Sequence, residues 1–196
     1  MSALNRVKFF SIIFLFLGAH YPVLSSDLAE TPGPRLHDND HGASRFDSHQ
    51  HDEVNMPGLR GKDTTAQEVS DLRRIFVLHR GIDRKVINLA DGIKTTTQAK
   101  DPQLRESVLS HVAMMVTRLA EGKNPEILIQ SPTLDQLFKF HKEIRTELMP
   151  TDWGITVIQT SSNPKVVELL QKHAAEVSEM ARRGMAAVHE RMEKSR

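Results

Sequence analysis

The chain has 196 residues with 26 basic and 25 acidic side chains, so its charge is nearly balanced. The sequence therefore shows no excess of basic residues of the kind that binds nucleic acid. Cysteine is absent, which excludes disulfides, thiolate metal sites, a lipoprotein anchor and haem attachment through a Cys-x-x-Cys-His motif. This length allows one domain of ordinary size plus extensions.

Residues 1–25 have the pattern of a secretory signal peptide. Arg6 and Lys8 form a charged start, residues 9–19 form an apolar run, and small residues precede a cleavage position after Ser25. The apolar run is short for a transmembrane span, and nothing later in the sequence is apolar enough to cross a bilayer. We expect an exported mature protein without a stable membrane span, periplasmic if the source is Gram-negative. The alternative is an uncleaved N-terminal anchor.

Residues 26–63 are predicted to be a disordered linker, because proline and glycine punctuate them and no apolar period runs through them. Four of the ten histidines lie here between aspartates: His37, His41, His49 and His51. Short His-rich tracts can bind Cu(II), Ni(II) or Zn(II) loosely. The alternative is a solubilising tether whose histidines have no function.

An internal duplication organises the predicted domain, residues 64–196. Residues 72–122 and 134–184 align without a gap at an offset of 62 positions. A fixed period of this kind indicates two copies of one structural unit. The identical pairs are Leu72/Leu134, Phe76/Phe138, His79/His141, Ile82/Ile144, Gly92/Gly154, Ile93/Ile155, Pro102/Pro164, Glu106/Glu168, His111/His173, Ala113/Ala175 and Gly122/Gly184.

The first copy begins with a predicted amphipathic helix. Thr64 or Thr65 offers a hydroxyl to cap its N-terminus. Apolar residues then recur at steps of three and four from Val69 to Leu89, the period of a helix with one buried stripe. The Asp-Gly pair that ends in Gly92 terminates this helix.

A strand and a second helix complete the first copy. Residues 93–97 are rich in β-branched side chains, which favours an extended strand. Asp101 is predicted to cap the N-terminus of the second helix, with Pro102 in its first turn. Gly122 is predicted to end this helix.

The second copy repeats this order. Ser131 or Thr133 caps its first helix, whose apolar stripe extends to Leu148. Residues 155–160 are a stronger strand candidate than their counterpart, and Asn163 caps the last helix.

Each copy is therefore predicted to be helix, strand, helix. A lone short strand leaves its backbone groups unpaired, so we expect the two strands to pair antiparallel across a pseudo-twofold axis, with four helices packed on them. Residues 93–97 should lie beside residues 155–159. The predicted fold class is α+β, mainly helical, and neither half is expected to fold alone.

Four histidines lie in the predicted apolar stripes and form two duplicated pairs, His79 with His141 and His111 with His173. A buried imidazole needs hydrogen-bond partners or a metal, since an unpaired polar group costs about 1–3 kcal/mol. These four residues are the candidate site.

Three interpretations of the histidines remain open. In the first, each ring bonds the backbone or threonines of the central strand and has a structural role. In the second, the rings bind a metal ion such as copper, or haem, between the copies, with Met114, Met115 and Met180 as soft additional donors. In the third they act as general acids or bases, but no partnered Ser or Cys nucleophile accompanies them.

The two copies share a recurring motif. It consists of His79, Ile82, Gly92, Ile93, Asp101, Pro102 and His111, repeated as His141, Ile144, Gly154, Ile155, Asn163, Pro164 and His173. This tandem motif resembles a pattern in uncharacterised exported bacterial proteins. The resemblance covers the predicted domain and implies duplication and export, but it carries no established activity.

These patterns together predict an exported binding module without catalytic activity. The most specific functional hypothesis is that the duplicated histidines bind a metal ion or haem. The alternative is a structural or protein-interaction module whose histidines are satisfied core groups. Stoichiometric metal or a Soret band in protein purified from its native compartment would separate the two.

Overall fold

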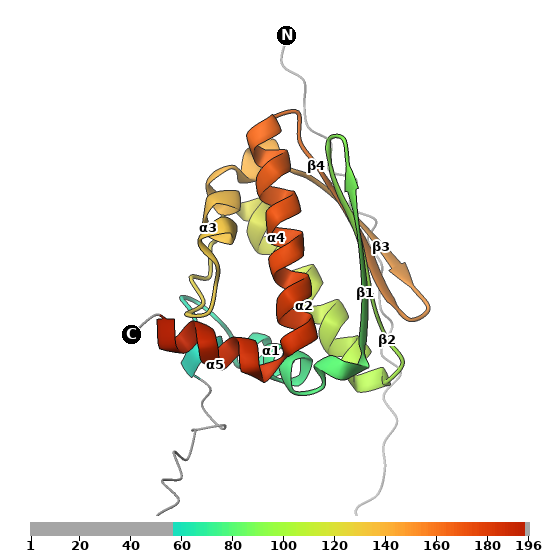
Figure 1. Ribbon diagram of the computed structural model, residues 1–196, viewed down its shortest axis with the longest axis vertical. Helices are drawn as coiled ribbons and strands as arrows, with labels where there is room; N and C mark the ends of the chain where they lie inside the picture. The colour runs from blue at the N-terminus through green and yellow to red at the C-terminus, as the bar shows by residue number, and fades with distance from the viewer. Residues whose placement is uncertain (1–56, 195–196) are drawn as a thin grey trace, which may run out of the picture. The chain divides into compact units, whose positions relative to one another are not determined.

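The computed structural model describes residues 57–194, so the predicted signal peptide and most of the predicted linker lie outside the described residues. The described part has five α-helices and one four-stranded antiparallel sheet (Figure 1). This confirms the predicted α+β fold class. Among residues 57–194, no helix combines the length and the apolar character that a membrane crossing requires.

The elements follow the same order in both copies, with one extra helix at the end. The first copy contains α1 (Ala66–Val77), β1 (Ile82–Leu89), β2 (Gly92–Ala99) and α2 (Pro102–Glu121). The second contains α3 (Pro132–Lys139), β3 (Arg145–Thr151), β4 (Gly154–Thr160) and α4 (Pro164–Arg183), and α5 (Met185–Lys194) follows. Three 3-10 turns are η1 (Pro57–Leu59), η2 (His79–Gly81) and η3 (His141–Glu143).

The central strands of the sheet pair as predicted. The strand order is β1-β2-β4-β3, and β2 runs antiparallel to β4. Thr95 lies opposite Val157, which is its own equivalent 62 positions later, and the register is symmetric about this pair. The two copies are therefore related by a pseudo-twofold axis that passes between β2 and β4.

The predicted first helix of each copy is wrong in its extent. Helix α1 ends at Val77 instead of near Leu89, and α3 ends at Lys139. In each copy a 3-10 turn follows, and the rest of the predicted helix is an edge strand, β1 or β3. Each copy is therefore helix, β-hairpin, helix, and the predicted single strand is the inner strand of the hairpin.

The edge strand β1 forms because its residues also alternate with a period of two. Ile82, Arg84 and Val86 are partly buried, while the residues between them are exposed. Such alternation is typical of a strand with one covered face. A two-residue turn at positions 90 and 91 then joins β1 to β2.

The predicted helix starts are confirmed by their capping bonds. Thr65 accepts a hydrogen bond from the Glu68 backbone N–H, and Asp101 accepts one from the backbone N–H of Leu104. Asn163 caps α4 in the same way, and Ser131, rather than Thr133, caps α3. Proline occupies the first turn of α2, α3 and α4. Its missing N–H costs nothing there, because backbone N–H groups in the first turn have no partner within the helix.

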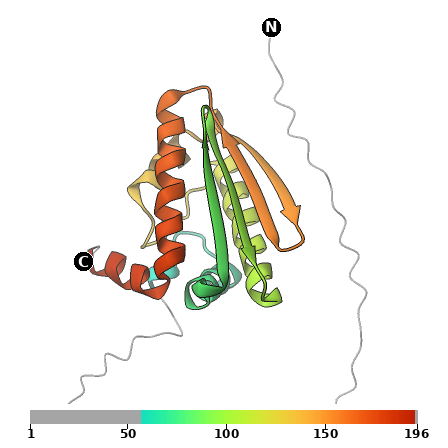
Figure 2. The same ribbon diagram turned by 45° about the vertical axis from the view of Figure 1, so that its right-hand side comes forward.

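Helices α2 and α4 lie on one face of the sheet, and no helix of the described chain covers the other face (Figure 2). Helix α4 packs on β1 and β2, and α2 packs on β2 and β4. A hydrophobic cluster of Ile93, Leu137 and Leu170 joins the sheet to α3 and α4. The helix-covered face of the sheet is therefore where the core of the molecule and any internal site lie.

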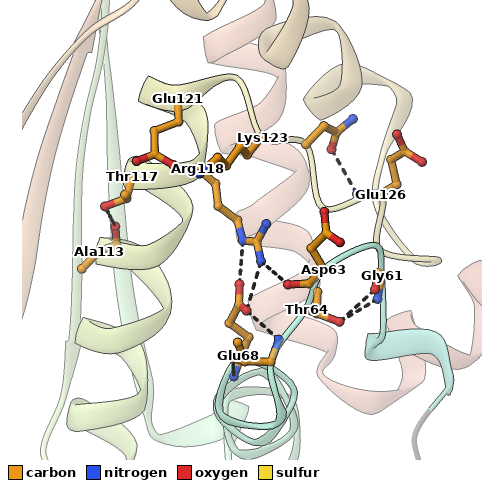
Figure 3. A network of polar contacts seen from close by, with 12 residues as sticks. Gly61, Asp63, Thr64, Glu68, Ala113, Thr117, Arg118, Glu121, Lys123 and Glu126 are labelled. Carbon is orange, nitrogen blue, oxygen red and sulfur yellow. Dashed lines mark hydrogen bonds and ion pairs between the residues drawn. The ribbon is translucent and has the colours of Figure 1, made fainter.

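Residues 57–63, which the sequence assigned to the end of the linker, lie against the helices that follow. Leu59 is fully buried in a cluster with α1 and α5. The guanidinium of Arg118 on α2 donates to both carboxylate oxygens of Glu68 at 2.6 and 3.1 Å and to the backbone oxygen of Asp63 at 2.8 Å (Figure 3). This network attaches the segment before α1 to the C-terminal turn of α2.

Candidate functional site

A cavity of about 260 Å³ lies between the sheet and its covering helices. Its wall comes from β1, β2 and β4 on one side and from α1, α2, α3 and α4 on the other. Most lining side chains are aliphatic, among them Ile93, Val112, Met115, Val157 and Val177. A cavity with an apolar wall and few polar groups is typical of sites for small ligands.

Two of the four candidate histidines line this cavity. His111 projects from α2 and His173 from the equivalent position of α4. Burial lowers the pKa of each imidazole to about 4, although the nearby carboxylates of Asp71 and Glu176 act in the opposite direction. Because burial dominates both pKa values, both imidazoles are neutral at pH 7.

The other two histidines have a different position, at the ends of helices. Nδ1 of His79 lies 3.0 Å from the backbone oxygen of Ala181 in the last turn of α4. Nδ1 of His141 lies 3.3 Å from the backbone oxygen of Ala120 in the last turn of α2. Each ring therefore hydrogen-bonds a free carbonyl at a helix C-terminus of the other copy.

These contacts also explain one duplicated glycine pair. A Cβ on Gly184 would overlap the ring of His79, and a Cβ on Gly122 would lie 2.8 Å from Nε2 of His141. The two contacts are equivalent under the 62-residue offset and cross between the copies. His79 and His141 thus hold the two copies together.

The four histidines do not form one site. His111 and His173 share a cavity, whereas His79 and His141 bond helix carbonyls and not the strand backbone or threonines named in the structural interpretation. Across residues 57–194, no three or more His, Cys, Asp or Glu residues are grouped as metal ligands. A metal or haem site made of duplicated histidines is therefore limited to the pair His111 and His173.

The two charged side chains of the cavity wall, Arg84 and Glu176, hydrogen-bond neighbouring hydroxyl groups. Arg84 on β1 donates from Nη1 to Oγ1 of Thr97 at 2.7 Å and from Nε to Oγ of Ser178 at 3.3 Å. Oγ1 of Thr133 donates to Oε1 of Glu176 at 2.8 Å. Oε2 of Glu176 and Nδ1 of His173 are buried without a hydrogen-bond partner within the described chain.

Arg84 is not among the residues that the sequence predicted for the site. In a helix with Ile82 and Val86 on its apolar stripe, position 84 would lie on the solvated side, so the predicted helix gives no reason to single it out. The signal that could have found it is the alternation of β1, which puts position 84 on the same face as its two apolar neighbours.

Comparisons with protein-family models, with curated proteins and with solved structures gave no match.

Proposed function

We propose that this protein is an exported, non-catalytic binding module that holds a small, mostly apolar ligand between the sheet and helices α2 and α4. The observation that carries this proposal is the cavity of about 260 Å³ with its largely aliphatic wall. An apolar cavity of about 150 Å³ is already large enough to bind benzene. Pockets for drug-sized ligands have volumes of about 300–1,000 Å³, so this cavity lies just below that range.

Protein interiors are close-packed, and an unfilled space leaves the side chains that line it without packing contacts on one side. A ligand that fills the space would supply those contacts.

Export remains part of the proposal on the strength of residues 1–25, which lie outside the described residues. A charged start followed by a short apolar run supports it. N-terminal sequencing of the protein from its native host tests it, and an intact Met1 on a cytoplasmic species would contradict export.

A metal ion or haem is a second candidate, supported by the neutral imidazoles of His111 and His173 on the cavity wall. Neutral imidazole is the form that binds metals. A porphyrin is larger than the cavity, so haem binding would also require the helices to move. Titration with haem or Cu(II) tests this candidate. A Soret shift or a stoichiometric copper signal that is lost in His111→Leu and His173→Leu would support it.

The test of apolar ligand binding is a titration with Nile red, a neutral dye that fluoresces in apolar surroundings. We expect saturable binding, and we expect Val112→Phe and Val177→Phe to weaken it about tenfold or more, because each added ring occupies cavity volume. The matched control is Ile87→Phe, which adds the same ring type on the open face of the sheet, where Ile87 is 43% exposed.

Two results would contradict the apolar-ligand proposal. One is the absence of saturable Nile red binding to the folded wild-type protein. The other is equal binding by Val112→Phe, Val177→Phe and Ile87→Phe, which would place the dye on the surface. Circular dichroism of each variant shows that the fold is retained.

A further inference from the structure

Arg84 is the residue of the cavity wall that the apolar-ligand proposal leaves unexplained. It lies on β1, on the helix-covered face of the sheet, with its guanidinium between β2 and α4. Its two hydrogen-bond partners, Thr97 and Ser178, are hydroxyl groups and carry no charge. Within residues 57–194 no carboxylate forms an ion pair with Arg84.

The charge of Arg84 is therefore desolvated without compensation. Burial lowers its pKa to about 10, which leaves the guanidinium fully protonated at pH 7. A guanidinium has five N–H donors, and the two hydrogen bonds to hydroxyls use only two of them. Buried charges in proteins are normally paired, because an unpaired one costs several kcal/mol.

The other charged residue of the cavity wall does not neutralise Arg84. Glu176 accepts a hydrogen bond from Thr133, and no hydrogen bond or ion pair in the described chain joins it to Arg84. His111 and His173 are neutral at pH 7, since burial lowers the pKa of both to about 4. Arg84 is thus the one cation among the described residues that line the cavity.

The second copy shows that the fold does not need a charge at this position. The equivalent of Arg84 is Thr146, and the equivalent of Thr97 is Gln159. Nε2 of Gln159 donates to Oγ1 of Thr146 at 3.3 Å, which replaces the Arg84–Thr97 bond by a neutral one between the same two positions. A cross-strand hydrogen bond is therefore available without a guanidinium, and the positive charge of Arg84 requires another reason.

We propose that Arg84 binds the carboxylate of an amphipathic ligand whose hydrocarbon body fills the cavity. This inference rests on the proposed function and names the ligand class as small aliphatic or aromatic carboxylic acids. The free N–H donors of a guanidinium match the two oxygens of a carboxylate, and such pairs are frequently bidentate. A carboxylate there would neutralise the buried charge while the apolar wall receives the rest of the molecule.

Matched ligands that differ in the head group test this inference. Decanoate and decanol have the same hydrocarbon length, and at pH 7 only decanoate is charged. Displacement of Nile red from the wild-type protein should require about tenfold less decanoate than decanol. In Arg84→Met this preference should disappear through weaker decanoate binding, while the affinity for decanol should stay within about twofold.

The matched control is Thr146→Met, which makes the same residue at the equivalent position of the second copy. We expect this variant to keep the wild-type preference for decanoate. If Arg84→Met does not fold, Arg84→Gln supplies the same measurement, because its amide can still donate to Thr97 but carries no charge.

The outcomes separate the two proposals. If decanoate and decanol both displace the dye equally, and Arg84→Met changes neither, then the cavity binds apolar ligands and the carboxylate inference is overturned. If neither ligand binds and Nile red does not bind either, the proposed function itself fails. A decanoate preference that Thr146→Met abolishes as fully as Arg84→Met would also overturn the role of Arg84.

Discussion

Replacing Arg118 by methionine is expected to lower the free energy of unfolding by about 3–5 kcal/mol, because it leaves the buried carboxylate of Glu68 without its ion-pair partner. The side chains of Arg118 and Glu68 are only 10% and 8% exposed, and their closest atoms are 2.6 Å apart. Glu68 also accepts the backbone N–H of Thr65, so the same carboxylate caps α1. Urea unfolding followed by circular dichroism measures the loss.

The second copy suggests a variant that should rescue Arg118→Met. The equivalent of Arg118 is Met180. Glu68→Gln combined with Arg118→Met therefore puts the residue of the second copy at position 118 and also removes the charge of the carboxylate that Arg118 pairs with. Because replacing both partners of a buried pair removes the uncompensated charge, we expect the double variant to be more stable than Arg118→Met alone.

The control is Arg182→Met on α4. Arg182 also pairs with a glutamate, Glu179, at 2.6 Å, but the two side chains are 70% and 50% exposed. Solvent-exposed pairs contribute about 0–1 kcal/mol, so this variant should unfold almost as the wild type does. Equal losses for Arg118→Met and Arg182→Met would contradict the buried-pair account.

The Glu68–Arg118 pair also predicts how stability depends on pH. Burial by itself raises the pKa of Glu68, but the hydrogen bonds from Arg118 and Thr65 outweigh it, and the pKa lies below its ordinary value of 4.5. A carboxylate with a lowered pKa in the folded state stabilises the protein above its unfolded-state pKa. We expect this contribution to be lost as the pH falls below about 4.5, and to be absent from Glu68→Gln.

The inner half of the fold could be predicted from the sequence, and the outer strands could not. Helix caps such as Asp101 and Asn163 have a local chemical signature, and an unpaired strand must find a partner, so the β2–β4 pairing followed from residues 93–97 and 155–159. The edge strand β1 was mistaken for helix because Ile82, Val86 and Leu89 are spaced by four and three, which also fits a helix.

Of the four histidines predicted to form the site, two line the cavity and two do not, again because the predicted helix ends early. All four histidines lay in apolar stripes of the sequence, but the chain leaves the helix just before His79 and His141, so these two rings reach the ends of neighbouring helices. His111 and His173 stay within long helices and face the sheet. Whether an apolar stripe faces a cavity depends on how the helices pack on the sheet, and the local sequence does not determine this packing.

Replacing Gly184 by alanine is expected to destabilise the protein by about 3 kcal/mol or more, for two reasons that can be measured separately. Gly184 has φ of 57° and ψ of −134°, a backbone conformation that residues with a Cβ rarely adopt. Holding alanine in this conformation costs about 1–3 kcal/mol. The new methyl group would also overlap the ring of His79, which hydrogen-bonds the last turn of α4. Thermal and urea unfolding measure the total loss.

Gly122→Ala, at the equivalent position, should cost less. Gly122 has φ of 68° and ψ of 21°, which is the left-handed helical region that other residues can enter at about 1–2 kcal/mol. Its methyl group would lie 2.8 Å from the ring of His141, an exposed contact that can move slightly. The control is Gly81→Ala, where the nearest atom is a terminal methyl group of Leu104 at 3.0 Å and φ is not positive.

A double-mutant cycle separates the clash with His79 from the backbone strain at Gly184. If His79 packs on Gly184 as described, His79→Ala should remove the clash, so that Gly184→Ala costs less in that background by about 1 kcal/mol or more. The strain from φ and ψ should remain, because it does not depend on the imidazole. Additive losses for the two substitutions would show that the His79 ring does not constrain Gly184, and the reciprocal His–Gly contact between the copies would then be wrong.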